Sequence, residues 1–207
     1  KEIWVYMDVR NDRLLGLGLN VLCKAKELAG PSGLIASAVI VDHFQTGKEA
    51  SPPPHADYVP AGDAAEKSVA YGADRVFVLD VAGLPVPRAD VCASALAEAV
   101  RRYGPSVVLF ALTDLGREIA ARTAMLCDAG LIADCADLKM AEGGVVTQCP
   151  SWGGKVLADI AFCDNDRTGF ATVQPHIAQA EPNPGTPGQT ERIPMPSFDL
   201  SRDPQLM

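Results

Sequence analysis

The stretch "LTDLGREIAARTAMLCDAGLIADCADLKM", residues 112–140, carries the signals that decide the fold of this chain. Thr113 and Asp114 have short side chains whose oxygens accept hydrogen bonds from the first free N–H groups of a helix. The helix that they begin is expected to end at Gly130, because glycine readily adopts the backbone conformation that closes a helix. The apolar run at residues 131–133 then predicts a further strand.

The sequence before this stretch alternates between strand-like and helix-like segments. Apolar runs predict strands at residues 3–9, 34–41, 75–81 and 107–111. Helices are expected at residues 14–29, 64–71 and 89–103, and a glycine follows each of them. Repeated strand–helix units of this kind predict an α/β fold: a parallel sheet with right-handed crossovers and helices on both faces.

The pattern changes after Gly130. "DCADLKM", "GVVTQC", "KVLADIAFC" and "GFATVQ" are short strand-like runs with no helix between them, so we expect antiparallel pairing. The predicted organisation is a parallel core at residues 1–130, antiparallel strands at 131–180 that pack on the core and face a partner, and an extended Pro- and Gly-rich linker or tail at 181–207. A Pro-rich insertion near residues 44–60 is longer than a usual loop and is either mobile or binds something.

The composition sets limits on the class of protein. The chain has 207 residues, of which 48% are hydrophobic, and a net charge of −8, which argues against a nucleic-acid-binding protein. No apolar run approaches the roughly 18 residues of a membrane span. The six cysteines have no CxxC spacing and no metal motif, which favours buried free thiols in a reducing cytoplasm.

Two motifs invite a reading as binding sites. "GLGLN", residues 16–20, could begin a dinucleotide site with Asp42 as the ribose acid, but Val21 occupies the position of the third glycine. A loop and helix start is therefore the favoured interpretation of this motif. No catalytic triad, paired carboxylates or metal-ligand spacing stands out, so we do not expect this chain to be an enzyme by itself.

Arg117 lies in the first turn of the helix that follows Thr113, where the helix dipole disfavours a cation. One interpretation is an ion pair with Asp114 one turn back. The other is an anion held at the helix N-terminus by Arg117 and the N–H groups around Thr113, at the sheet edge where α/β proteins bind ligands. Thr113 and Arg117 are the candidate cofactor-binding residues.

Several segments together carry a family resemblance. "GREIAARTAMLCDAGLIADCADLKM" resembles the part of electron transfer flavoprotein alpha subunits in which a Gly–Arg helix runs into an L-x-A-D-C sequence. "CPSWGGKVLADI" is similar to that family's following hairpin, and "GFATVQP" to its T-V-R-P strand. "YGADRVFVLD" matches the family's Gly-Ala-Asp strand entry, and the motifs occur in the family's order over residues 3–175.

The resemblance implies that the chain is the first domain of such an alpha subunit. In that family this domain is a Rossmann-like, adenine-nucleotide-alpha-hydrolase-like parallel sheet followed by a small antiparallel sheet, which a beta-subunit strand completes. The expected partners are a beta-like subunit, in a heterodimer, and an acyl-CoA or other dehydrogenase as electron donor. The beta subunit's similar domain holds AMP or a second FAD, whereas the alpha subunit's first domain has no nucleotide of its own. This favours a structural or interface role for Arg117.

The chain departs from the family pattern at two positions and at its end. Cys149 stands where relatives often have an arginine before proline, and Gln174 replaces the arginine of T-V-R-P. In relatives a linker leads to a second domain that binds FAD, and this chain ends at Met207, just past the linker. FAD is therefore expected in the assembled flavoprotein and not tightly bound to this chain alone. The sequence then represents a truncated or proteolysed form, or one product of a split gene.

Two functions follow as hypotheses. The first is the scaffold of an electron carrier, which docks a beta-like subunit and an FAD-binding domain so that electrons pass from dehydrogenases to a quinone-linked or other acceptor. The alternative is a stand-alone nucleotide-binding or regulatory α/β module, supported only by "GLGLN" and Asp42.

Overall fold

The computed structural model describes residues 1–43, 57–81, 87–142, 144–163, 167–183 and 187–196. Seven strands form one sheet in the order β10-β3-β2-β1-β4-β9-β5, and every neighbouring pair is parallel. The strands are β1 (Glu2–Met7), β2 (Ile35–Asp42), β3 (Arg75–Asp80), β4 (Val107–Ala111), β5 (Leu131–Cys135), β9 (Gly169–Val173) and β10 (Gln189–Pro194). The predicted parallel α/β sheet is therefore confirmed.

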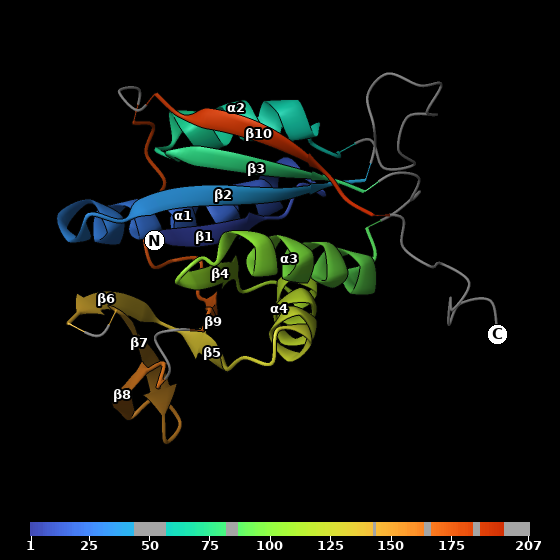
Figure 1. Cartoon of the computed structure of the whole chain (residues 1–207). Coiled ribbons are helices and arrows are strands. Elements are labelled where there is room, and N and C mark those ends of the chain that lie inside the picture. The colour runs from blue at the N-terminus through green and yellow to red at the C-terminus, as the bar shows by residue number, and fades with distance from the viewer. Residues whose placement is uncertain (44–56, 82–86, 143, 164–166, 184–186, 197–207) are drawn as a thin grey trace.

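Helices cover both faces of this sheet (Figure 1). They are α1 (Asp12–Ala29), which continues into the short 3₁₀ helix η1 (Gly30–Ser32), α2 (Ala61–Ala70), α3 (Ala89–Tyr103) and α4 (Asp114–Leu126). Side chains of α1 and α2 belong to one buried cluster and those of α3 and α4 to another, so each helix pair covers its own face.

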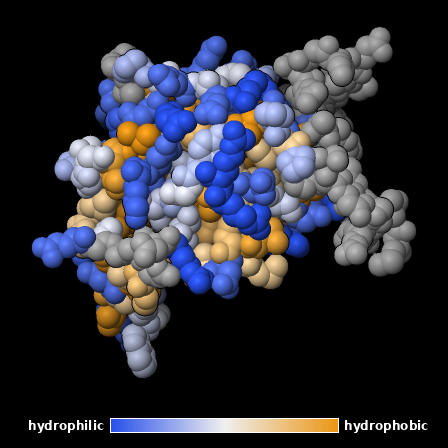
Figure 2. Space-filling model, viewed as in Figure 1, coloured by the Kyte–Doolittle hydropathy of each residue, from blue (hydrophilic) through white to orange (hydrophobic). Residues whose placement is uncertain are grey.

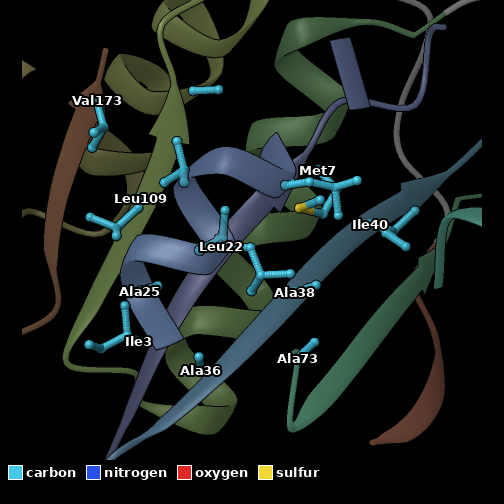
Figure 3. Close-up of a cluster of buried hydrophobic side chains, with 14 of the residues drawn as sticks. Ile3, Met7, Leu22, Ala25, Ala36, Ala38, Ile40, Ala73, Leu109 and Val173 are labelled. Atoms are coloured by element: carbon cyan, nitrogen blue, oxygen red, sulfur yellow. The ribbon is translucent and has the colours of Figure 1, made fainter. Parts of the chain in front are cut away.

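The alternation of side chains along β1 shows why two cores form. Ile3, Val5 and Met7 point to the cluster under α1, whereas Trp4 and Tyr6 point to the cluster under α3. Successive residues of a strand face opposite sides of the sheet, so an uninterrupted apolar run is what a sheet buried on both faces requires. Figure 3 shows the α1 face, where Leu22 and Ala25 of the helix lie over apolar side chains of the sheet.

A second, antiparallel sheet of three strands projects from the first (Figure 1). Its strands are β6 (Asp137–Ala141), β7 (Gly144–Ser151) and β8 (Val156–Ala161), in that order. Leu138, Val145 and Cys149 are buried in the same cluster as α1, so this sheet packs on the main core through one side of β6 and β7. The predicted small antiparallel sheet is confirmed.

The antiparallel prediction is wrong for "GFATVQ". These residues form β9, which lies between β4 and β5 and pairs in parallel with both. The chain leaves the main sheet after β5, builds the small sheet and then returns, so the small sheet takes the place of a crossover helix. Parallel strands need a long connection, but that connection need not be helical. Because every residue of β9 is buried, its run was also compatible with a central parallel strand.

The region predicted as an extended linker or tail also contains sheet structure. Residues 189–194 form β10, which extends the sheet at the outer edge of β3. Ile193 is the single buried residue of this strand, so its sequence has little of the apolar signal that marks the other strands. Residues 197–207 and 44–56, the latter being most of the Pro-rich insertion, lie outside the described part of the chain.

Candidate functional site

The carboxyl edge of the main sheet is the place where an open α/β fold binds ligands, at the point where the strand order reverses. Here that point lies between β1 and β4, because β2 and β3 follow β1 on one side and β4 lies on the other. The segments that follow these two strands contain Asp8, Arg10, Thr113 and Arg117. Both sequence-predicted site residues are therefore at this edge.

Thr113 is the N-cap residue of α4. Its backbone is extended, with φ at −122°, and its Oγ1 accepts a hydrogen bond of 3.0 Å from the Gly116 N–H. Gly116 has no room for a side chain, because a Cβ there would lie 2.5 Å from the Ala111 carbonyl oxygen. The glycine thus lets α4 begin directly against the end of β4, and the Thr113 hydroxyl is committed to capping.

Arg117 reaches a carboxylate that the helix-spacing argument did not identify. Its Nη2 lies 3.4 Å from both carboxylate oxygens of Asp134, at the end of β5. The sequence interpretation had paired Arg117 with Asp114. Both partners of the observed pair are about half exposed, at 54% and 51% of their side-chain surface. Water therefore screens the pair, which has the character of a surface contact between α4 and β5.

Asp134 has an unusual backbone that turns its side chain toward α4. Its φ of +59° falls in the left-handed region, and the β5–β9 register shifts between Ile132 and Cys135. The Asp134 N–H donates a 2.9 Å hydrogen bond to Oγ1 of Thr172 on β9. Asp and Asn adopt this conformation more readily than most residues, which gives the aspartate of the "LIADC" segment a structural reason.

The switch point itself is filled by an ion pair within one turn of chain. Nε and Nη2 of Arg10 lie 2.9 and 2.7 Å from the two carboxylate oxygens of Asp8, whose side chain is 5% exposed. The hydrogen bonds that Arg10 donates to Asp8 raise the pKa of the guanidinium, and the nearby Asp114 carboxylate adds to that effect. The cation at this edge is thus already neutralised by the chain's own carboxylate, which leaves little charge for an incoming anion.

The "GLGLN" motif does not form a loop. Residues 16–20 lie inside α1, where a Cβ on Gly18 would be 3.1 Å from the Met7 side chain. Asn20 fastens a distant segment: its Nδ2 donates to the Pro175 carbonyl, and its Oδ1 accepts from the Ala180 N–H. The interpretation of this motif as a loop and helix start was therefore wrong in its first half, since the helix already starts at Asp12.

Asp42, the candidate ribose acid, is 2% exposed and faces an arginine from the tail. Nη1 of Arg192 lies 3.1 Å from Oδ2 of Asp42 and 2.6 Å from Oδ1 of Asp80. Burial raises the pKa of Asp80, although Arg192 opposes that shift. Sequence reasoning missed Arg192, because only the addition of β10 to the sheet brings residue 192 beside residues 42 and 80.

The residues described at this edge do not fit the pyrophosphate of FAD or another dinucleotide. The glycines that would form a phosphate loop are inside a helix, and a hollow of about 610 Å³ beside the start of α1 includes Asp12, Asp57 and Asp63 in its lining. Carboxylates repel a diphosphate. Over the same described residues, no three His, Cys, Asp or Glu side chains gather as metal ligands, and no helix is long and apolar enough to cross a membrane.

The most exposed apolar side chains lie on the antiparallel sheet. Trp152, Val156, Leu157 and Ile160 are 84%, 51%, 57% and 38% exposed, respectively. All four belong to the β7–β8 hairpin turn or to β8, which is an outer strand of the small sheet. Figure 2 shows hydrophobic residues on this projecting part of the molecule. We refer to these four residues as the β8 patch.

Comparison with known proteins gives a consistent family. Residues 55–197 match the model of the electron transfer flavoprotein domain. The electron transfer flavoprotein subunit alpha of Thermoanaerobacterium thermosaccharolyticum is 30% identical over 86% of this chain and 49% of its own length. The corresponding subunit of Clostridium acetobutylicum is 27% identical over 88% of this chain and 50% of its own length.

A third relative carries a different name. The lactate dehydrogenase (NAD(+),ferredoxin) subunit LctC of Acetobacterium woodii is 30% identical over 84% of this chain and 38% of its own length. The chain therefore spans about half or less of the length of these three relatives.

Proposed function

We propose that this chain, which belongs to the electron transfer flavoprotein domain family, is the scaffold domain of an alpha-type subunit. In this role it docks a beta-type subunit and an FAD-binding domain in the cytoplasm. Electrons pass from an acyl-CoA or other dehydrogenase to FAD and on to a quinone-linked or other acceptor. The chain is a component of an electron carrier and not a catalyst, and FAD, held outside the residues described above, supplies the redox chemistry.

The β8 patch is the observation that carries the docking role. An outer strand leaves a row of backbone N–H and C=O groups without partners, and proteins usually protect such an edge with charged side chains. β8, "VLADIA", has Asp159 as its one charged residue, and that carboxylate already lies 2.8 Å from the Lys139 ammonium of β6. The rest of the strand is apolar and exposed, which suits the addition of a partner strand.

The charge distribution around β8 supports a partner with an apolar strand. Val156 and Ile160 lie on one side of the strand, whereas Leu157 lies on the side of Asp159. Gln148 Nε2 donates a 2.8 Å hydrogen bond to Asp159, so the polar groups of that side satisfy one another. An incoming strand would gain hydrogen bonds from the edge and would bury the four apolar side chains of the β8 patch.

A binding measurement with the beta-type subunit tests this proposal. Leu157→Asp places a charge in the β8 patch, so the affinity for the beta-type subunit is expected to fall at least tenfold. Thr190→Asp, on the exposed edge strand β10, is the matched control and should bind like wild type. Circular dichroism of both variants checks that the fold is intact. Equal affinities of wild type and the folded Leu157→Asp variant would remove the β8 patch from the proposal.

A flavin readout tests the electron-carrier role separately. The isolated chain, the beta-type subunit and an FAD-binding domain are mixed in the presence of FAD. We expect a yellow complex only when the other polypeptides are present. Bound adenine nucleotide released from the isolated chain on denaturation would favour the alternative function, a stand-alone nucleotide-binding module.

A further inference from the structure

Two cysteines meet at the junction between the two sheets. Cys135 is the last residue of β5 in the main sheet, and Cys149 lies on β7 in the small sheet. Their sulfur atoms are 3.7 Å apart, and the residues are 0% and 6% exposed. The backbones beside them are joined as well, since the Ala136 N–H donates a 2.7 Å hydrogen bond to the Gln148 carbonyl.

The surroundings of this pair are weakly polar and hold the thiols toward each other. Cys135 Sγ contacts the Ile132 carbonyl at 3.8 Å, and Cys149 Sγ contacts the Ala133 carbonyl at 3.6 Å. Thr147 Oγ1 lies 3.8 Å from Cys149 Sγ. These long contacts are weak, so rotation of the two side chains could bring the sulfurs to the roughly 2.05 Å of a disulfide at small cost.

We propose that Cys135 and Cys149 are a reversible redox pair whose disulfide fastens the antiparallel sheet to β5. The oxidant is a hydroperoxide, which is small enough to enter a site that is almost closed. Cys149, the more exposed of the two, attacks the peroxide as a thiolate, forms a sulfenic acid and releases hydroxide. The Cys135 thiolate then attacks the Cys149 sulfur, so that an S–S bond forms and the S–O bond breaks.

The balance of this reaction is complete. Two thiols and one hydrogen peroxide give one disulfide and two waters, with the two thiol protons ending in the water. A dithiol reductant reverses the step by thiol–disulfide exchange. Burial raises the pKa of the Cys135 thiol to about 12, so its attack is slow while the site is closed and faster when the small sheet opens.

The cross-link would restrain the sheet that carries the β8 patch. β7 joins β6 and β8, so a bond from Cys149 to β5 limits movement of the whole small sheet against the core. An effect on partner affinity rests on the proposed docking function, whereas formation of the bond does not. Failure of the cross-link and failure of docking therefore have separate readouts.

Peptide mapping of the full chain tests the proposal. The chain is treated with hydrogen peroxide, alkylated and digested with trypsin without reduction. We expect a cross-linked pair of peptides, residues 123–139 and 140–155, that has lost two hydrogens and separates after dithiothreitol. Amide hydrogen exchange in β6 and β7 should become at least tenfold slower in the oxidised chain and should recover on reduction.

Three variants locate the bond. Peptide 123–139 also contains Cys127, so Cys127→Ser should keep the cross-link, whereas Cys135→Ser and Cys149→Ser should each lose it. If either of the last two fails to fold, fragmentation of the wild-type cross-linked peptides assigns the bonded residues directly. The proposal is overturned if peroxide oxidises the exposed Cys163 while Cys135 and Cys149 stay reduced, or if the bond joins Cys127 to Cys149.

Discussion

Arg192 lies across the carboxyl ends of two strands, with its Nη1 3.1 Å from Oδ2 of the buried Asp42. The same nitrogen lies 2.6 Å from Oδ1 of Asp80, so one cation from β10 serves two carboxylates. The Asp42 side chain is 2% exposed, so the arginine compensates a charge that water hardly reaches. The ion pairs thus connect the last described strand to the centre of the sheet.

We predict that Arg192→Met destabilises the chain by about 2 kcal/mol. Removing one partner of a buried pair typically costs about 3–5 kcal/mol, and the 45% exposure of Arg192 lowers that figure. Urea unfolding measures the effect. Arg122→Met is the control, because its pair with Glu118 is half exposed on both sides and should contribute under about 1 kcal/mol. Equal losses in the two variants would contradict the role of Arg192.

Arg117→Ala is expected to change the free energy of unfolding by under about 1 kcal/mol, because its partner Asp134 is on the surface. A deeply buried pair would have cost more. Urea unfolding at low and high salt checks this, since screening should remove most of a surface effect. A loss of about 3 kcal/mol that persists at high salt would instead indicate a charge removed from water.

The fold could be predicted further than the site. Apolar runs such as β1 and β4, bounded by glycines and helix caps, make the parallel core legible, because each signal is local. β10 could not be found this way, because a single buried residue, Ile193, anchors it and its pairing with β3 joins segments more than 100 residues apart. Arg192 at Asp42 was missed for the same reason.

The partner of Arg117 illustrates a different limit. Helical spacing favours Asp114, but the pair with Asp134 depends on where β5 ends and on a positive φ at that residue. Neither is visible in the periodicity of the sequence. Thr113 could be predicted as the cap, because capping is decided within four residues of chain.

Gly116→Ala should destabilise the chain by about 2 kcal/mol or more, because the added methyl would lie 2.5 Å from the Ala111 carbonyl oxygen and α4 would have to shift. Gly62→Ala is the matched control. Gly62 lies in α2, and a methyl added there would meet nothing within 4 Å, so alanine should stabilise by about 0.5–1 kcal/mol. Thermal or urea unfolding of both variants decides, and two changes of the same sign would contradict the steric argument.

His43 should make the stability depend on pH in the acid range. Burial lowers its pKa from 6.5 to about 4, against the smaller opposing effect of Asp8. The unfolded chain therefore takes up a proton first, so this contribution is full above pH 6.5 and is lost as the pH falls toward 4. Between pH 7 and pH 5 the loss is about 2 kcal/mol.

Urea unfolding of wild type and His43→Gln over that pH range isolates this contribution, because the carboxylates titrate in both proteins. The wild-type curve should fall more steeply. His176→Gln, which changes an exposed histidine, should follow wild type. Parallel curves for wild type and His43→Gln would show that His43 does not resist protonation.

The last prediction concerns FAD and the switch point between β1 and β4. Titration of the isolated chain with FAD should leave the flavin fluorescence unquenched at micromolar protein, because Arg10 is paired with Asp8 and Asp114 adds a further negative charge nearby. Gly16→Ala supplies a second check. Gly16 lies in the interior of α1 with open space around it, so alanine should stabilise the helix by about 0.5–1 kcal/mol. A phosphate loop would lose its close backbone approach on that change. Stoichiometric quenching in wild type that Gly16→Ala abolishes would show that the "GLGLN" segment binds the cofactor after all.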